Sequence, residues 1–288
     1  MNILIVAKQS KIEWEQQKFG IGPEEIKQKY TAEHANLKNI LESHEKQLAV
    51  RQTFKQVFNN TDMVIMASSD FEMAIRKQYN LIISLGGDNC FTYVSNHLPN
   101  TPILGINSDP QRSVGCLTQY AVHTDKDIYD LSEKIDDRRY RIEEWTRLVA
   151  EVDGKVITQA TSEYFLGERQ RVDMSRHILI YRGREVEQKC SGLLIATGAG
   201  SSGWLRSCGG DYVWPCSAKY VCFKATEIYS EEKRASSGIL SEGEELIVHS
   251  LNDNEGIISA DSFDTYAFNR GSSAKIRIGN PLRVMVPK

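Results

Sequence analysis

The sequence predicts an α/β domain built on a parallel sheet, followed by a β-rich domain. In the first half, apolar runs alternate with polar helical stretches, which is typical of strand–helix–strand units around a parallel sheet. In the second half, short β-prone runs follow one another between turn signals such as Arg182-Gly183. The pattern changes near residue 122, so we predict domains at 1–122 and 123–288, and the closing segment 273–288 can pack on either one.

The first half supplies the elements of the parallel sheet. Residues 2–7 form an apolar run that predicts a strand, and Gly22 and Pro23 then open one long helical pattern. Its apolar positions recur near helical spacing at Ile26, Tyr30, Leu37, Leu41 and Leu48. Further strands are predicted at 63–66, 81–85 and 103–107, with a helix capped by Asp70 after the first and another helix at 126–137. Polar loops follow strands 81–85 and 103–107, at the edge where open sheets place their ligands.

The second half is predicted to be mostly β. Its β-prone runs are short, and turn signals separate them. The predicted strands are residues 148–152, 155–161, 177–181, 193–196, 220–223 and 246–249.

Composition narrows the class of protein. Of the 288 residues, 41% are hydrophobic and 25% are charged, the balance of a soluble protein with a substantial core. A net charge of -3 provides no basic surface, so we expect neither a nucleic acid nor a membrane as partner. Residues 1–7 carry no basic leader and are too short for a signal peptide, so we expect a cytoplasmic protein. The six cysteines and six histidines lack metal-ligand spacing, so we expect reduced cysteines and no protein-bound metal.

The most distinctive local motif is Gly86-Gly87-Asp88-Asn89, directly after the predicted strand 81–85. Paired glycines let the backbone turn tightly and point N–H groups at an anion. Asp88 places a carboxylate at the mouth of the sheet, where it can take a proton from a sugar hydroxyl or hold Mg²⁺ during phosphoryl transfer. A simple turn that caps the next helix is the alternative interpretation, and the motif alone does not decide between the two.

Two further motifs have side chains suited to a nucleotide. Residues 191–204 join an apolar strand to a loop of small and hydroxyl residues, which lets a nucleotide approach the backbone closely. The loop lacks the G-K-[ST] ending of a Walker A loop, and a flexible surface loop has a similar composition. Ser162-Glu163 stands at the end of a predicted strand, where a carboxylate either accepts hydrogen bonds from ribose hydroxyls or is simply solvated.

In this order, the motifs resemble those of the NAD kinase family. That family carries a G-G-D-G loop after a strand, an I-x-G-[IV]-N segment, an Asn-Glu pair and a later D-G-L-x-x-[AS]-T-P-[TS]-G-[ST]-T-A-Y loop. The matching segments here are 86–89, 103–107, 162–163 and 191–204. Residues 108–115 and 164–168 look most like the mitochondrial-type branch. The resemblance implies an NAD kinase/diacylglycerol kinase-like fold: a Rossmann-like α/β domain, a β-rich domain and an active site in the cleft between them.

The resemblance also implies an enzyme that transfers the γ-phosphoryl group of ATP to the 2'-hydroxyl of the adenosine ribose of NAD, giving NADP, with Mg²⁺ as cofactor. Asp88 would be the catalytic residue, accepting or orienting the hydroxyl proton. The other implied site residues frame the phosphates, hold the ribose or line the dinucleotide site. They are Gly86, Gly87, Asn89, Asn107, Ser162, Glu163, Ser191, Thr197, Gly200, Ser201 and Ser202. We also expect a homo-oligomer, because a neighbouring subunit easily completes a glycine-rich cleft.

The chain departs from the family pattern at Asn89, Ser162, Ser191 and residues 202–204. Asparagine tolerates a positive φ, so we expect Asn89 to keep a left-handed turn. The changes at Ser162 and Ser191 remove an amide and a carboxylate, and they bear on substrate choice more than on fold. Two other functions stay open: a nucleotide-binding sensor or pseudoenzyme, and a lipid kinase of the related family, which needs an apolar entrance that the sequence does not show.

Overall fold

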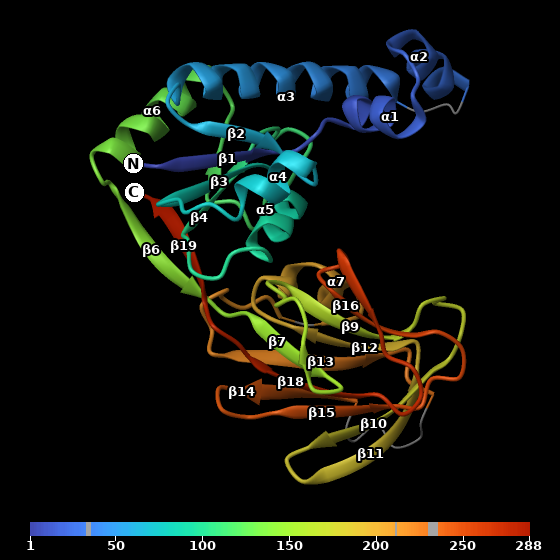
Figure 1. Ribbon diagram of the computed structural model, residues 1–288. Coiled ribbons are helices and arrows are strands. Elements are labelled where there is room, and N and C mark those ends of the chain that lie inside the picture. The colour runs from blue at the N-terminus through green and yellow to red at the C-terminus, as the bar shows by residue number, and fades with distance from the viewer. Residues whose placement is uncertain (33–35, 211, 230–235) are drawn as a thin grey trace. The chain divides into compact units, whose positions relative to one another are not determined.

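The computed structural model describes residues 1–32, 36–210, 212–229 and 236–288, and it divides the chain into two compact units (Figure 1). Unit 1 comprises Met1–Val94, Leu98–Glu143 and Arg283–Lys288. Unit 2 comprises Ser95–His97 and Glu144–Leu282. The contacts of the chain thus change unit at residue 143, later than residue 122, where the sequence predicts the domain boundary. One of the six histidines, His34, lies outside the described residues.

Unit 1 is built around a largely parallel sheet with the strand order β2-β1-β3-β4-β19-β6, and β5 lies beside β4. The pairings of β1 with β2 and β3, and of β4 with β3, β5 and β19, are all parallel. The strands are β1 (Ile3–Ala7), β2 (Asp62–Ile65), β3 (Leu81–Gly86), β4 (Ile103–Asn107), β5 (Tyr120–Ala121), β6 (Tyr140–Trp145) and β19 (Leu282–Pro287). This is the parallel α/β domain that the sequence predicts.

Helices cover both faces of this sheet (Figure 1). They are α3 (Leu37–Val57), α4 (Ser69–Ala74), α5 (Asp88–Ser95) and α6 (Asp125–Asp136). Two further helices, α1 (Lys11–Phe19) and α2 (Pro23–Ala32), pack against the start of α3 in a separate apolar cluster. Phe54 of α3 and Leu131 of α6 share one buried cluster with Ile5, Ile83 and Leu104, which are alternate residues of the central strands. The helix α5 packs on the opposite face, where a Cβ on Gly105 would lie 2.8 Å from the Phe91 ring. Sheet and helices thus enclose the core and leave the strand ends open.

Three helical features differ from the predictions. The long helix predicted from Pro23 onward is two helices, because Asn36 caps the start of α3 by accepting a hydrogen bond from the Asn39 N–H. The helix α1 was not predicted, although Ser10 and Glu13 form a capping box that the sequence pattern S-x-x-E indicates. The cap of α4 is Ser68 and not Asp70.

Unit 2 consists mainly of two antiparallel sheets, with strand orders β11-β10-β15-β18-β7-β8 and β14-β13-β12-β9-β16-β17. Side chains from both sheets, among them Ala150, Leu166, Ile195, Val248 and Ile276, form one buried core. The first sheet contains β7 (Leu148–Val152), β8 (Lys155–Val156), β10 (Ser175–Tyr181), β11 (Arg184–Cys190), β15 (Leu246–Ser250) and β18 (Ser273–Ile278). The second contains β9 (Glu163–Glu168), β12 (Gly192–Ala196), β13 (Tyr220–Thr226), β14 (Ser237–Ser241), β16 (Gly256–Ala260) and β17 (Asp264–Ala267). The short helices η1 (Gly200–Ser202) and α7 (Trp204–Ser207) follow β12.

The predicted strands of this half correspond to β7, β10, β12, β13 and β15, but the run 155–161 is shorter than predicted. Only Lys155–Val156 pairs as a strand, because Thr158 leaves the ladder to bond the Tyr266 hydroxyl through its N–H and its side chain. The closing segment divides between the units: β18 lies in a sheet of unit 2, and residues 283–288 belong to unit 1.

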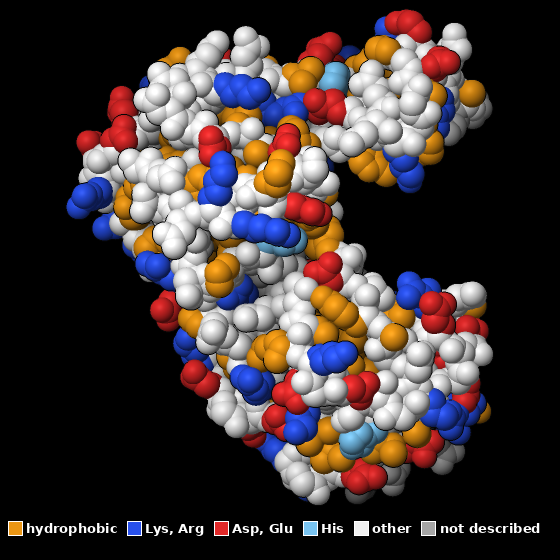
Figure 2. Space-filling model, in the orientation of Figure 1, with side chains coloured by type: hydrophobic (Ala, Val, Ile, Leu, Met, Phe, Trp, Pro, Cys, Tyr) orange, Lys and Arg blue, Asp and Glu red, His pale blue; other side chains and the backbone are white. Residues whose placement is uncertain are grey.

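On the face shown in Figure 2, acidic and basic side chains are interspersed over the surface of each unit. In the part of the chain that the structure describes, no helix combines the length and apolar character needed to cross a membrane.

Candidate functional site

The motif of residues 86–89 lies where the buried strand β3 passes into the helix α5. Neither glycine adopts a positive φ, so tight turning is not the reason for glycine here. Space is the reason: a Cβ on Gly86 would lie 2.7 Å from the Cys90 Cβ and 2.9 Å from the Lys8 Cβ. A Cβ on Gly87 would lie 2.8 Å from the Ser113 Oγ. The paired glycines therefore let β1, α5 and the segment after β4 approach the end of β3 closely.

Asn89 was expected to keep a left-handed turn, and that expectation is wrong. The residue is helical, lies in the first turn of α5 and is not among the residues with a positive φ. Its side chain is exposed at the surface of unit 1. A helical residue needs no glycine, so the replacement of the family's last glycine by asparagine does not disturb this turn.

Asp88 is the first residue of α5, and its side chain is half-buried. Its Oδ2 accepts a hydrogen bond from the Cys116 N–H at 3.0 Å, and its Oδ1 accepts one from the Leu117 N–H at 2.8 Å. The carboxylate therefore anchors the segment between β4 and β5, a contact that the motif alone did not indicate. Each carboxylate oxygen has a further lone pair for another partner, because an ionised carboxylate accepts about four hydrogen bonds.

Asn107 ends β4 and is buried, and its side chain shapes the same segment. Its Nδ2 donates to the Ser113 carbonyl oxygen at 2.9 Å, and its Oδ1 accepts from the Asp109 N–H at 3.2 Å. Gly115 has a φ of +67°, and a Cβ there would lie 2.5 Å from the Asn107 Nδ2. The predicted nucleotide-binding residue is thus an internal brace of residues 107–115 in this structure.

In unit 2, three strand ends bring Glu163, Thr197 and Asp261 to one edge of a sheet. Glu163 begins β9, whereas the sequence predicted it at the end of a strand. The antiparallel register pairs Ala196 of β12 with Glu163, and Ala260 of β16 with Tyr164. The residues that follow β12 and β16 therefore lie beside the start of β9.

Asp261, which the sequence analysis did not select, holds this edge together. Its carboxylate accepts three backbone hydrogen bonds, from the N–H groups of Thr161 (2.7 Å), Ser162 (2.8 Å) and Glu163 (2.7 Å). It is buried at a φ of +50°, and burial raises its pKa to about 6, although the three N–H bonds favour the charged form. An acidic residue directly after the apolar run 256–260 was the available signal.

Glu163 faces the turn that follows β12. A Cβ on Gly200 would lie 2.7 Å from the Glu163 Oε2 and 2.4 Å from the Ser162 carbonyl oxygen, so only glycine fits there. Burial, followed by repulsion from the charge of Asp261, raises the pKa of Glu163 to about 8. Near neutral pH this carboxyl group is therefore largely protonated, so it can donate a hydrogen bond as well as accept one.

Two hydroxyl residues of this turn bond to its own backbone and to the neighbouring residues Thr161 and Trp214. The Thr197 Oγ1 donates to the Thr161 carbonyl oxygen at 2.6 Å and accepts from the Ala199 N–H at 3.1 Å. The Ser201 Oγ donates to the Gly198 carbonyl oxygen at 2.7 Å and accepts from the Trp214 N–H at 3.2 Å. Both residues are buried, whereas Ser202 is half-buried. Thr197 and Ser201 thus fix the shape of the turn.

The structure brings together most of the predicted site residues, in two groups. Residues 86–89 and Asn107 gather at the end of β3 and β4 in unit 1, and Ser162, Glu163, Thr197 and Gly200 gather in unit 2. Ser191 lies apart, because it precedes β12 whereas Thr197 follows it, and five strand residues span roughly 17 Å. Among the described residues, no group of three or more His, Cys, Asp or Glu side chains is placed to hold a metal ion.

Comparisons with known proteins give one consistent likeness. The chain is 28% identical over 173 residues to an NAD kinase of Clostridium beijerinckii, covering 58% of this chain and 59% of that protein. It is 32% identical over 143 residues to an NAD kinase of Rhodococcus erythropolis, covering 47% of this chain and 43% of that protein. The matched segments thus span about half the length of these curated relatives. No family model matches the chain.

Two solved structures share its fold. An Archaeoglobus fulgidus NAD kinase in complex with ATP aligns with a TM-score of 0.66 and 17% identity, covering 99% of this chain and 93% of that chain. A yeast NADH kinase complexed with NADH aligns with a TM-score of 0.70 and 12% identity, covering 100% of this chain and 84% of that chain. The chain therefore has the two-domain fold of NAD kinases, as the sequence predicts.

Proposed function

We propose that this chain is a member of the NAD kinase family and transfers the γ-phosphoryl group of ATP to the 2'-hydroxyl of the adenosine ribose of NAD. Four ordered motifs, the fold and the similarity of about half of the chain to curated NAD kinases support this proposal. The two solved neighbours are described as complexes with ATP and with NADH, which are the two classes of ligand that the reaction requires.

The observation that carries the proposal is the placement of Glu163 at the edge of the second sheet of unit 2. Gly200 lets the turn after β12 pack directly against Ser162 and Glu163, which fixes the position of this carboxyl group. Two vicinal ribose hydroxyls can bond the two carboxyl oxygens at once, as acidic residues do in many dinucleotide sites. We assign the ribose contact to Glu163, with Ser162 and Thr197 shaping its surroundings.

In unit 1, Asp88 is the proposed base. It lies at the carboxyl edge of a parallel sheet, half-buried, and its orientation is fixed by two N–H groups. A carboxylate in a fixed orientation can accept the proton of a ribose hydroxyl as the phosphoryl group is transferred. The backbone N–H groups at the start of α5 would favour the phosphate oxygens, because the first N–H groups of a helix have no partners within the helix.

The residues present fit Mg²⁺ that arrives with the nucleotide. Mg²⁺ keeps several waters and commonly takes one or two carboxylates together with substrate phosphates. Asp88 offers one such carboxylate with unused lone pairs, and the described residues contain no preformed cluster of acidic ligands. When bound, the ion would offset the negative charge of the transferred phosphoryl group.

Purified protein incubated with NAD, ATP and Mg²⁺, and read out through an NADP-specific dehydrogenase, tests the proposal directly. Formation of NADP at a rate proportional to enzyme concentration is the expected result. Binding of NAD without turnover would favour a nucleotide sensor or pseudoenzyme, and turnover only with a lipid alcohol would favour a lipid kinase. A reaction without Mg²⁺ tests the metal requirement. Polyphosphate in place of ATP tests the phosphoryl donor, and NADH in place of NAD tests the acceptor.

Three finer assignments belong to the same proposal. We propose the mitochondrial-type branch of the family, because residues 108–115 and 164–168 look most like it. We propose a homo-oligomer, which light scattering at micromolar concentration tests, and a cytoplasmic location, which fractionation of the source cells tests.

A further inference from the structure

We propose that Arg112 is a positioning residue that fixes Asp88 through the segment 108–117, with Asp109 and Ser43 as its partners. The inference rests on the proposed function, in which Asp88 is the base. It assigns to the helix α3 a part in fixing the proposed base through the segment that follows β4. All of these residues belong to unit 1.

The orientation of the Asp88 side chain depends on the backbone of residues 116 and 117. Both carboxylate oxygens receive an N–H from that backbone, at 3.0 and 2.8 Å. Hydrogen bonds to a charged group are stronger than those between neutral groups, so this pair determines the side-chain orientation of Asp88. Any movement of residues 116–117 therefore moves the carboxylate.

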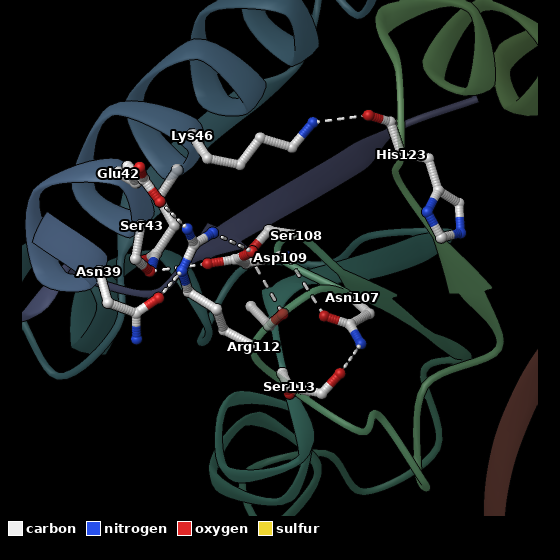
Figure 3. A network of polar contacts seen from close by, with 12 residues as sticks. Asn39, Glu42, Ser43, Lys46, Asn107, Ser108, Asp109, Arg112, Ser113 and His123 are labelled. Atoms are coloured by element: carbon white, nitrogen blue, oxygen red, sulfur yellow. Dashed lines mark hydrogen bonds and ion pairs between the residues drawn. The ribbon is translucent and has the colours of Figure 1, made fainter.

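The segment 108–113 is attached to α3, as Figure 3 shows. The Asp109 carboxylate accepts from the Ser43 Oγ at 2.7 Å and from the Arg112 Nη1 at 3.2 Å. The Arg112 guanidinium also donates to the Glu42 Oε2 at 2.6 Å and to the Asn39 Oδ1 at 2.5 Å. Asp109 is buried and the side chain of Arg112 is only 19% exposed, so the two bonds to Asp109 are partly shielded from solvent, whereas the bonds of Arg112 to Glu42 and Asn39 are exposed. One guanidinium thus joins two turns of α3 to the loop.

The loop between Arg112 and residues 116–117 is short and internally bonded. Asn107 braces the loop internally through the Asp109 N–H and the Ser113 carbonyl oxygen, and Ser108 is bonded to the Gly86 carbonyl oxygen through its N–H at 2.8 Å. Only three residues, 113–115, separate Arg112 from Cys116, and a Cβ on Gly87 would lie 2.8 Å from the Ser113 Oγ. The loop is therefore too short and too closely packed to move at Arg112 without moving at residues 116–117.

Arginine suits this position because its planar group presents several donors in fixed directions, whereas lysine presents a single ammonium. Arg112→Lys should keep part of the contacts of the guanidinium, and Arg112→Met none of them, while the bond from Ser43 to Asp109 stays in place. Ser43→Ala removes that bond and the one that Ser43 Oγ accepts from Gln47 Nε2, but it leaves the guanidinium contacts, so its effect should be the smallest of the three. Arg141→Met is the matched control, since Arg141 is exposed in β6 and pairs with Glu143.

The experiment measures steady-state kinetics and amide hydrogen exchange on the full chain. Arg112→Met should lower kcat by about 10- to 100-fold, the scale of a small misplacement of a reacting group, with KM changed far less. Arg112→Lys should recover part of the loss, and Arg141→Met should match the wild type. Exchange at the amides of residues 116 and 117 should accelerate in Arg112→Met, while exchange in strand 81–86 should not change.

A double substitution separates positioning from general destabilisation. In an Asp88→Asn background, Arg112→Met should reduce kcat much less than in the wild type, because the group it positions is already disabled. A full, multiplicative loss in that background overturns the inference, as does unchanged exchange at residues 116–117. If the wild type itself forms no NADP, the proposed function fails, and the exchange measurement alone decides whether Arg112 fixes the loop that holds Asp88.

Discussion

Replacement of Asp88 by asparagine separates three roles for this residue: base, helix cap and loop anchor. Asparagine retains one acceptor oxygen but presents an amide group to the second backbone N–H of the 116–117 pair. One charge-assisted hydrogen bond is lost, which should cost about 1.5 kcal/mol, the low end of the range because the side chain is partly exposed. A fall of roughly 3 to 6 °C in melting temperature corresponds to that loss in a chain of this size.

Catalysis should respond more strongly than stability. An amide cannot accept a proton from the 2'-hydroxyl, so kcat should fall about 100-fold or more, equivalent to about 2.7 kcal/mol of transition-state stabilisation. The experiment measures NADP formation, NAD affinity by calorimetry and melting temperature for Asp88→Asn. The control is Asp70→Asn, which changes an exposed carboxylate in the first turn of α4. Near-normal turnover in a folded Asp88→Asn protein would refute the role as base. A melting temperature equal to that of the wild type would refute the loop-anchor role, because a simple cap tolerates asparagine.

Three predictions concern the edge of unit 2. Above about pH 8, where Glu163 is ionised, Glu163→Ala should weaken NAD binding by roughly 1.5 to 3 kcal/mol, the range for hydrogen bonds to a charged group, and calorimetry that shows unchanged affinity excludes the ribose contact. Because burial raises the pKa of Glu163 from 4.5 to about 8, the unfolded chain ionises first as pH rises, so the free energy of unfolding should fall between about pH 4.5 and 8. Denaturant titrations measure the free energy of unfolding across this range, and above pH 6 it should fall less with pH for Glu163→Gln than for the wild type. Below pH 6, Asp261, with a pKa of about 6, adds a decline of the same sign in both proteins. Gly200→Ala should cost about 1 to 3 kcal/mol of stability, since its Cβ would lie 2.4 Å from the Ser162 carbonyl oxygen, and an unchanged melting temperature would contradict the close packing.

The features predicted well from sequence are those that depend on residues close together in the chain. The apolar runs at β1, β3 and β4 are buried strands, and β4 has the predicted bounds, Ile103–Asn107. The motif of residues 86–89 lies at the carboxyl end of β3, as a parallel sheet requires of the segment that follows a strand. Periodicity and turn residues determine such elements locally, so a single sequence suffices to find them.

The contacts that orient the candidate side chains join distant residues, and sequence patterns did not reveal them. Asp261 lies 98 residues from Glu163, and Cys116 lies 28 residues from Asp88. Strand pairing in unit 2, which has no local signature, determines that β9, β12 and β16 are neighbours. Local context also misled the prediction of a left-handed Asn89, because a helix starting at Asp88 places the residue in the ordinary helical region.

Three departures from the family pattern, Asn89, Ser162 and Ser191, lie at positions where the described contacts use backbone atoms or where the side chain is exposed or distant from the two clusters. Residue 162 is held by its N–H, which donates to Asp261, and by its carbonyl oxygen, which accepts from the Thr197 N–H at 2.9 Å. Serine makes both contacts as well as asparagine does. Asn89 is exposed on α5, and Ser191 lies at the opposite end of β12 from the turn at Thr197. Asp88 and Glu163, the two acidic residues of the matched motifs, are both present, and each is held by the contacts described above. These three departures therefore do not disturb the contacts that build the two clusters, so we predict that the chain forms NADP, and comparison of kcat/KM for NAD and NADH measures whether the acceptor preference has changed.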